Sequence, residues 1–376
     1  MMKGGLVLVT DTVGMIVEIV DETDAGDEIE VMEGILTPGF INAHCHIELS
    51  HMRGLIPEHT GLVDFVQKLM GSRNIASAEE KGAAMTAAEE ELRLSGTVAI
   101  GDICNGTDSL LLKQQSKLYW HNFIEVSGFV DNNARERLDA AGQVLASFRA
   151  ACPLQGNSLA PHAPYSVSRK LFRLLDQKTK ADVTSIHNQE AAAENELYES
   201  KTGDFLALYK NFGIDIAGFL PTGKTSLRSW LPYFNSGQKV LAVHNSFTSD
   251  EELAELARPP RLTNGQSPVI HFCICINANL YIENKLPPIE ALINRKVGIV
   301  LGTDSYASNR QLNMMQEMQT IQRHFPQVSL PTMLQWATIN GARALGIQDR
   351  FGTLEPGKKP GLVLVDEKNF SARPLL

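Results

Sequence analysis

The sequence lacks an excess of basic residues. Lysine and arginine together number 34 against 43 aspartates and glutamates, which gives a formal net charge of −9 at pH 7. Binding to nucleic acid or to an anionic membrane needs a basic face that neutralises phosphates. We therefore expect a small-molecule partner, with neither nucleic acid nor a membrane as a binding surface.

Long apolar runs and a cysteine framework are also missing. The apolar runs within residues 1–22 are interrupted by acidic residues and glycines before they reach the length of a signal peptide or a membrane span. Five cysteines, an odd number without regular spacing, suit a reducing compartment better than a disulfide scaffold. These features predict a cytoplasmic protein.

What the sequence does contain is one repeated pattern from about residue 35 onward. A short apolar, β-rich run is followed by a turn and then by a segment with helical periodicity. The eight apolar runs cover residues 35–46, 96–103, 121–129, 157–165, 183–190, 239–246, 268–276 and 297–305. The clearest helical segments cover residues 78–95, 134–150, 168–179, 309–324 and 330–345. This alternation predicts an α/β protein with a closed (β/α)8 barrel of the TIM type, and an open doubly wound sheet is the alternative.

The two ends of the chain predict short strands outside this pattern. Residues 5–22 have near-alternating apolar positions around a turn, and residues 351–369 hold a further short run between glycines and a proline. We expect both ends to form one small β-sandwich domain, residues 1–36 and 350–376. The barrel then occupies residues 37–349.

Histidine and aspartate residues stand at the ends of several predicted strands. His44 and His46 end the first strand, and side chains two apart on a strand point the same way. His187, His244 and Asp304 end the fifth, sixth and eighth strands. The carboxyl ends of barrel strands converge on one face, where barrel active sites are built. The pattern therefore predicts one catalytic metal site.

The residue types suit one divalent metal ion per chain. Three imidazoles and a carboxylate are ligands typical of Zn²⁺, with Fe²⁺ as the alternative. We predict His44, His46, His187 and Asp304 as the ligands. Since four protein ligands leave only a water position, we place His244 beside that water.

Two further residues are candidates for catalysis and substrate binding. Glu190 follows His187 by three residues and is expected above the metal, where it could take a proton from the water. The alternative is an exposed acid in an acidic loop. His162 ends the fourth strand and could donate a hydrogen bond to the substrate, with a purely structural histidine as the alternative.

Several segments together resemble one superfamily. PGFINAHCH, HAPYS, HNQE, HNS, GTDS and GTLEPGKKPGLVLVD resemble the amidohydrolase superfamily, in the branch of cytosine, guanine and S-adenosylhomocysteine deaminases, in the correct order through nearly the whole chain. Within that branch, HCHIELSHMRG, GLVDFVQKLM and GTVAIGDICN are most similar to aminodeoxyfutalosine deaminases of bacterial menaquinone synthesis.

The resemblance implies a role for each candidate residue. His44, His46, His187 and Asp304 match the metal ligands of the family, Glu190 its proton shuttle and His244 the histidine that orients the attacking water. Asp304 also takes the second proton, while Glu48 and His162 are assigned to the substrate, Glu48 to polar groups such as ribose hydroxyls.

The resemblance also implies a reaction. The expected activity is hydrolytic release of ammonia from an adenine-bearing nucleoside, namely 6-amino-6-deoxyfutalosine. Deamination of S-adenosylhomocysteine, methylthioadenosine or another nucleobase compound is the alternative substrate assignment. Relatives often form dimers, so a homodimer is one of the expected oligomeric states.

Competing classes lack a residue that they need. Binuclear relatives carry a bridging lysine on the fourth strand, and residues 156–166 contain none. Small deaminases of the cytidine type combine His-x-Glu with Pro-Cys-x-x-Cys, and this combination does not occur in the sequence. Cys273 and Cys275 lie on an apolar predicted strand and are expected to be core residues. The Gly-x-Ser-x-Gly elbow of serine hydrolases is absent. A non-catalytic ligand-binding barrel remains the alternative of another class, and the intact ligand set opposes it.

Overall fold

The computed structural model describes residues 5–26, 29–257 and 267–375. Within these ranges, eight strands form two parallel four-stranded sheets. The first sheet contains, in spatial order, β4 (Phe40–Cys45), β5 (Thr97–Cys104), β6 (Tyr119–Val126) and β7 (Gly156–Pro161). The second contains β8 (Val183–Asn188), β9 (Lys239–His244), β10 (Val269–Ile274) and β11 (Gly298–Leu301). The spatial order thus follows the chain order, as in a barrel.

Hydrogen bonds join the two sheets at both of their edges. Between β7 and β8, the backbone N–H of His187 donates to the carbonyl of His162 at 2.9 Å. Between β4 and β11, the Asn42 amide donates to the Thr303 hydroxyl at 2.7 Å and accepts from the Thr303 N–H at 3.1 Å. The prediction of a TIM-type (β/α)8 fold is confirmed.

Most residues of the barrel strands are buried, on both faces of the strands. In β4, Phe40 belongs to the cluster that packs against the helices, whereas its neighbour Ile41 belongs to the cluster inside the barrel with Val243 of β9. Strands covered on both sides read as continuous apolar runs rather than as alternating ones. This explains why the sequence shows eight compact apolar runs.

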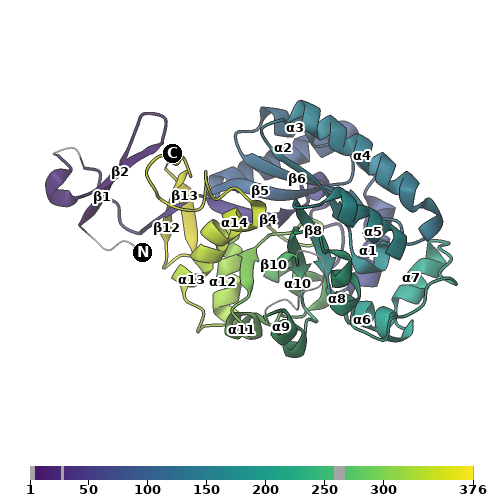
Figure 1. Ribbon diagram of the computed structural model, residues 1–376. Coiled ribbons are helices and arrows are strands. Elements are labelled where there is room, and N and C mark those ends of the chain that lie inside the picture. Colours follow the sequence, from purple (N-terminus) through teal and green to yellow (C-terminus); the bar gives the residue numbers. More distant parts are fainter. Residues whose placement is uncertain (1–4, 27–28, 258–266, 376) are drawn as a thin grey trace.

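Helices surround the strands on the outside (Figure 1). In the first half these are α1 (Leu62–Ser72), α2 (Ala78–Leu94), α3 (Leu110–Gln115), α4 (Ala134–Ala151), α5 (Arg169–Lys178), α6 (Ala192–Ser200) and α7 (Phe205–Asn211). In the second half they are α8 (Ser226–Trp230), α9 (Asp250–Leu256), α10 (Ile276–Glu283), α11 (Ile289–Asn294), α12 (Met314–His324), α13 (Leu330–Gln335) and α14 (Gly341–Leu345). Among the described residues, none of the helices combines the length and apolar character needed to cross a bilayer.

Two predicted helices differ from the observed ones. The helix expected from residue 309 begins only at Met314, because the Asn309 side chain instead donates to the Thr303 carbonyl and holds this segment against the end of β11. The helix expected over residues 330–345 contains a π-helical turn, Trp336–Asn340, between α13 and α14.

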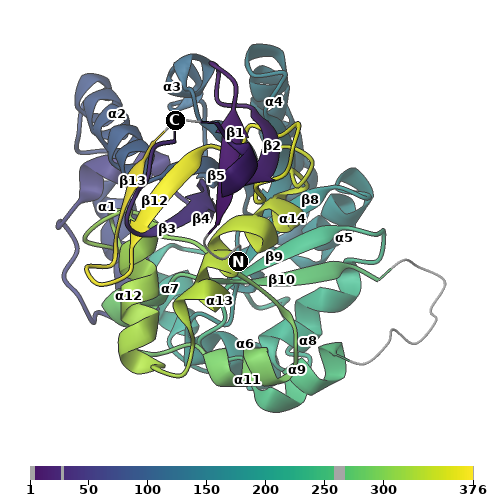
Figure 2. The ribbon, with the colours of Figure 1, turned by 90° about the vertical axis from the view of Figure 1, so that its left-hand side faces the viewer.

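The two ends of the chain meet in small antiparallel sheets. β3 (Ile35–Pro38), β12 (Leu362–Asp366) and β13 (Ser371–Pro374) form one sheet, while β1 (Leu6–Thr10) and β2 (Ile16–Asp21) form a hairpin beside it (Figures 1 and 2). The run over residues 35–46 was expected as one strand, but it divides at Gly39 into β3 and β4. A Cβ at Gly39 would lie 2.2 Å from a methyl carbon of Val98, so only glycine fits there. The limits of the two predicted domains stay a prediction.

Candidate metal centre and active-site cavity

Five predicted residues from four strands meet at the carboxyl end of the barrel. His44 lies in β4 and His46 directly after it, His187 in β8 and His244 at the end of β9, and Asp304 follows β11. His44 Nε2 lies 3.1 Å from His46 Nε2, which lies 3.3 Å from His187 Nε2. Asp304 Oδ1 lies 3.5 Å from His44 Nε2 and 3.3 Å from His46 Nε2.

These separations fit a metal ion. In a tetrahedral zinc site with Zn–N bonds of 2.0–2.1 Å, ligand atoms lie roughly 3.3–3.4 Å apart. His187 Nδ1 donates to the His162 carbonyl at 2.7 Å, which leaves the lone pair on Nε2, facing the other ligands. Lone pairs converging at such distances repel one another unless a cation lies between them. The side chains of His44, His46, His187 and Asp304 can therefore hold a divalent metal ion.

The backbone turns sharply at these strand ends. His244 and Asp304 have positive φ angles of 75° and 59°, a conformation that side chains other than glycine rarely adopt. The N–H of Asp304 is held by the His44 carbonyl at 3.1 Å. Such conformations cost free energy and cluster at functional sites.

Close packing at the end of β11 requires the glycine of the GTDS segment. A Cβ at Gly302 would lie 2.9 Å from both the Cβ and the carbonyl oxygen of His44. Gly302 therefore lets the strand bearing Asp304 approach the strand bearing His44.

Glu190 and His244 lie together beside the ligands. Glu190 Oε1 is 3.5 Å from His244 Nε2, and both side chains are buried. Asn279 uses its amide NH₂ to donate to the His244 carbonyl and to Ser246, so its Oδ1 faces His244 Nδ1 as an acceptor at 2.9 Å. His244 Nδ1 thus carries the hydrogen, and Nε2 presents a lone pair toward the cavity.

Burial and neighbouring charge shift the pKa values of these groups. Burial, with smaller contributions from the charges of Asp304 and Glu283, raises the pKa of Glu190 well above its usual value. Burial lowers the pKa of His46 to about 3, despite the opposing charge of Asp304. The imidazole of His46 is therefore neutral, as a metal ligand must be.

Asp304 is the ionised member of the group. Burial opposes its ionisation, but the neighbouring imidazoles of His44, His46 and His244 favour the charged carboxylate and hold the pKa of Asp304 below its usual range. The Ser308 hydroxyl also donates to Asp304 Oδ2 at 2.5 Å.

A cavity of about 200 Å³ opens onto these residues. His46, His187, Glu190, His244 and Asp304 line it. One wall is the face of α1 that carries apolar residues at helical spacing, namely Leu62, Phe65, Val66, Leu69 and Met70. This cavity combines an apolar wall with a few polar groups beside the candidate metal centre, as small-molecule sites do.

The structure brings His162 to this cavity. Its ring lies 5.0 Å from that of His187, and its Nδ1 lies 2.6 Å from the Ser166 hydroxyl. That hydroxyl donates to the Ala163 carbonyl, so Nδ1 is the donor toward Ser166. His162 Nε2 therefore carries a lone pair, which can accept a hydrogen bond from a bound molecule.

Glu48 is not brought to the cavity. The segment Ile47–Met52 forms a 3-10 helix, and the Glu48 carboxylate accepts hydrogen bonds from the Asn105 N–H at 3.0 Å and the Ser109 hydroxyl at 3.1 Å. Its side chain is buried behind the strand ends, outside the set of residues that line the cavity. The Glu48 carboxylate is thus occupied by Asn105 and Ser109, and its contact with a substrate stays a prediction.

Three residues that the sequence did not single out line the same cavity: Arg73 after α1, Asn105 after β5 and Glu125 in β6. They form a chain of hydrogen bonds, in which Arg73 donates to Asn105 Oδ1 at 3.3 Å and Asn105 Nδ2 donates to Glu125 Oε2 at 2.5 Å. The sequence does contain an indication for Glu125, because this residue lies near the end of β6, within the apolar run over residues 121–129.

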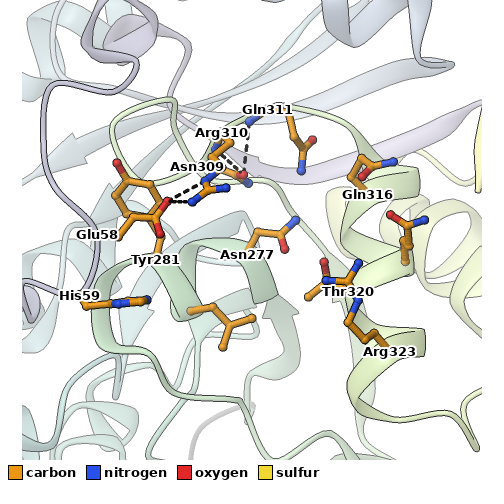
Figure 3. Close-up of a pocket in the computed structure, with 12 residues that line it drawn as sticks. Glu58, His59, Asn277, Tyr281, Asn309, Arg310, Gln311, Gln316, Thr320 and Arg323 are labelled. Atoms are coloured by element: carbon orange, nitrogen blue, oxygen red, sulfur yellow. Dashed lines mark hydrogen bonds and ion pairs between the residues drawn. The ribbon is translucent and has the colours of Figure 1, made fainter.

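A second cavity, of about 310 Å³, lies between α10 and α12 (Figure 3). Glu58 and Arg310 form an ion pair at its edge, and Asn277 and Thr320 face it from the two helices. It contains none of the candidate metal ligands.

The chain is similar to known proteins over most of its length. Residues 35–374 match the profile described as "Amidohydrolase family". The 5'-deoxyadenosine deaminase of Methanobrevibacter smithii is 24% identical, over 99% of this chain and 82% of that protein. The crystal structure of Helicobacter pylori aminofutalosine deaminase in complex with methylthio-coformycin superposes with a TM-score of 0.80 at 24% identity, covering 96% of this chain and 87% of that one. An adenosine deaminase from Xanthomonas campestris with bound zinc gives a TM-score of 0.71 at 23% identity, covering 94% and 78%.

Proposed function

We propose that this chain, which belongs to the amidohydrolase family of hydrolytic enzymes acting on carbon–nitrogen bonds, removes ammonia from an adenine-bearing nucleoside. The observation that carries the proposal is the meeting of His44, His46, His187 and Asp304 beside Glu190 and His244 in one cavity. The names of the matching relatives, which are nucleoside deaminases, support the substrate class.

The geometry supports a role for each of these residues. The four ligands would hold a divalent metal ion, Zn²⁺ by our proposal, and such an ion would lower the pKa of a water at the site to about 7. His244 Nε2, with its lone pair toward the cavity, accepts a hydrogen bond from that water and orients it toward the amino-bearing ring carbon. Glu190 takes a proton from the water and delivers it to a ring nitrogen, which prepares the ring for loss of ammonia. Asp304 takes the second proton from the attacking oxygen, and this proton passes to the amino group, which leaves as ammonia.

Within this class we propose 6-amino-6-deoxyfutalosine as the substrate, which would place the enzyme in menaquinone synthesis. That nucleoside carries a carboxyphenyl group beyond its ribose. The apolar face of α1 ends at Arg73, whose guanidinium donates a hydrogen bond to Asn105. An apolar wall that ends in a cation suits an aryl carboxylate. S-adenosylhomocysteine, which also carries a carboxylate, is the alternative substrate.

An ammonia-release screen of the zinc-loaded protein tests the function. The panel is 6-amino-6-deoxyfutalosine, S-adenosylhomocysteine, methylthioadenosine, adenosine, guanine and cytosine. We expect turnover of an adenine nucleoside, with the highest kcat/KM for a carboxylate-bearing one. Activity confined to guanine or cytosine rejects the proposal, and a protein that binds these compounds without releasing ammonia is instead a ligand-binding barrel.

The substitution Arg73→Met tests the substrate assignment. We expect it to lower kcat/KM for the carboxylate-bearing nucleosides by roughly tenfold to hundredfold, as for loss of a charged hydrogen bond, and to change that for adenosine and methylthioadenosine by less than about twofold. Lys68→Met, on the same helix but outside the cavity, is the matched control. An equal loss for all four nucleosides contradicts a carboxylate-binding role.

A further inference from the structure

Gln189 has an unusual backbone conformation between a candidate metal ligand and the proposed proton carrier. It directly follows β8, which contains His187, and directly precedes Glu190. Its φ angle is 45°, in the left-handed region that side chains other than glycine rarely adopt. An extended residue at this position would continue the direction of β8. The chain turns instead, and Glu190 Oε1 comes to lie 3.5 Å from His244 Nε2.

Each polar group of Gln189 is hydrogen-bonded within the protein. The backbone N–H donates to Glu194 Oε1 at 2.6 Å, and the carbonyl accepts from the Phe247 N–H at 3.0 Å. Side-chain Oε1 accepts from the Thr248 hydroxyl at 2.6 Å, and Nε2 donates to Glu252 Oε1 at 3.1 Å. Gln189 is fully buried and is not among the residues that line the cavity. It can therefore act on the reaction only through its neighbours.

The surroundings of this side chain suit an amide. Nε2 faces acceptor oxygens of Glu252 and Asn195, whereas Oε1 faces the Thr248 hydroxyl. A carboxylate in this place would set a second anion against Glu252, and an apolar side chain would leave these polar groups without their partner. The amide thus fits in one orientation, which fixes the side chain.

Helix α8 anchors the partners of Gln189 in turn. The Thr225 hydroxyl donates to Glu252 Oε1, and the Ser226 N–H donates to Asn195 Oδ1 at 2.9 Å. Asn195 belongs to α6 and Glu252 to α9, and these two helices lie together with α8 beside the barrel (Figures 1 and 2). The three helices therefore give the Gln189 side chain fixed partners.

We propose that Gln189 is a positioning residue for the deamination: its buried side chain holds the left-handed turn that presents Glu190 to the cavity. This inference rests on the proposed function and extends it to a residue that does not touch the substrate. The hydrogen bonds of the side chain offset the cost of the turn. Proton transfer depends on the placement of the carboxylate, and a displacement of about 1 Å can lower a rate roughly hundredfold.

Two substitutions separate the side chain from the backbone conformation. Gln189→Met keeps the length of the side chain but removes its hydrogen bonds, so the turn is no longer held. Gln189→Gly removes the side chain but adopts a positive φ without strain. In the zinc-loaded enzyme with its best nucleoside substrate, we expect kcat to fall roughly tenfold to hundredfold in Gln189→Met and less in Gln189→Gly, with KM within about threefold of the wild type. Gln143→Ala, an exposed glutamine on α4, should match the wild type.

Hydrogen exchange gives a readout without turnover. The amides of residues 187–190 should exchange roughly tenfold faster in Gln189→Met than in the wild type, while those of β5 exchange equally in both. The metal content should stay at one ion per chain, because the four ligands are unchanged. A general loss of stability would instead accelerate exchange in β5 as well.

Thr248→Val tests the same interaction from the other side. It removes the hydroxyl that donates to Gln189 Oε1, so kcat should fall, though less than in Gln189→Met. The double variant should be no slower than Gln189→Met alone, because both changes remove one shared interaction. Thr86→Val, an exposed threonine on α2, is the matched control. Multiplied losses in the double variant contradict the proposal.

Failure of this inference is distinguishable from failure of the proposed function. If the wild type deaminates none of the nucleosides in the panel, the proposed function fails, and exchange at residues 187–190 alone then decides whether Gln189 holds the turn. If the wild type is active, a Gln189→Met variant with kcat within about twofold of the wild type overturns the positioning role. A Gln189→Gly variant as slow as Gln189→Met also overturns it, since the side chain would then act by packing rather than through the turn.

Discussion

Glu190 Oε1 lies 3.5 Å from His244 Nε2 at the edge of the candidate metal centre, and both side chains are buried. Glu190 lies just after β8 and His244 ends β9, and each presents an atom that can accept a proton to the same small volume. Burial raises the pKa of Glu190 above its usual value, which is the direction that suits a group that both takes and returns a proton. His244, anchored by Asn279, has the fixed orientation of a positioning group.

Glu190→Gln should keep the metal and lose the activity. The amide preserves the size of the side chain but cannot carry the proton, so we expect kcat to fall by roughly 10²- to 10⁴-fold. Metal analysis and deaminase kinetics on the same preparation measure both effects. Glu199→Gln, an exposed acid on α6, should match the wild type. A nearly fully active Glu190→Gln enzyme would remove Glu190 from the proton transfer.

The candidate metal centre could be predicted from the sequence because each of its ligands stands at the end of a recognisable apolar run. His44, His187 and His244 each lie at the end of a compact apolar run, and such runs could be recognised one at a time. Their meeting then follows from barrel closure, which places the carboxyl ends of all strands on one face.

Which loop acid reaches the cavity could not be predicted in the same way. The segment after His46 continues as a 3-10 helix, and this turns Glu48 toward Asn105 and Ser109. That outcome depends on the loop after β5, far away in sequence. The role of α1 as an apolar wall of the cavity could not be predicted either, because the periodicity of its sequence indicates a helix but not the cavity that the helix faces.

Removal of the metal should inactivate the enzyme and lower its stability. Prolonged treatment with a chelator leaves the lone pairs of His44, His46 and His187 facing one another without a cation. A ligand present at 100 times its Kd stabilises a protein by about 2.7 kcal/mol, so a lower melting temperature and full recovery with Zn²⁺ are expected. One metal ion per chain should be found by elemental analysis.

His187→Ala provides the corresponding variant. It should bind far less metal, show no recovery with added Zn²⁺ and keep the barrel fold by circular dichroism. His324→Ala, an exposed histidine at the end of α12, should retain a full metal content. Equal metal content in both variants would exclude His187 from the ligands.

A buried ion pair holds the backbone next to the candidate ligand His46. Lys113 Nζ lies 2.5 Å from Asp102 Oδ2, and both side chains are fully buried. The other oxygen, Asp102 Oδ1, accepts the N–H of Ile47 at 2.8 Å, directly after His46. Lys113→Met should destabilise the protein by about 3–5 kcal/mol, because it leaves the Asp102 charge buried without a partner.

A double substitution tests whether this cost comes from the unpaired charge. Asp102→Asn combined with Lys113→Met should recover part of the lost stability, as measured by urea unfolding of the wild type and the variants. Lys117→Met, an exposed lysine nearby, should change the free energy of unfolding by less than about 0.5 kcal/mol. Equal stability of Lys113→Met and the wild type would show that the pair contributes nothing.

The stability of the protein should depend on pH through Glu317. This side chain is buried, and burial raises its pKa to about 7, although Asn277 and Asn309 donate hydrogen bonds that favour the charged form. The folded protein therefore keeps the proton up to about pH 7, whereas the unfolded chain releases it near pH 4.5. Between these values the folded state binds more protons, so the contribution of Glu317 to stability falls as pH rises.

Glu317→Gln removes this titration. The free energy of unfolding of the variant, measured with urea from pH 4.5 to pH 8.5, should improve relative to the wild type as pH rises to about 7 and then stay at a constant difference. Glu367→Gln, an exposed acid after β12, should follow the wild-type profile throughout. Parallel profiles for Glu317→Gln and the wild type would mean that Glu317 is ionised in the folded protein at pH 5, with the three amide hydrogen bonds from Asn277 and Asn309 outweighing the cost of burial.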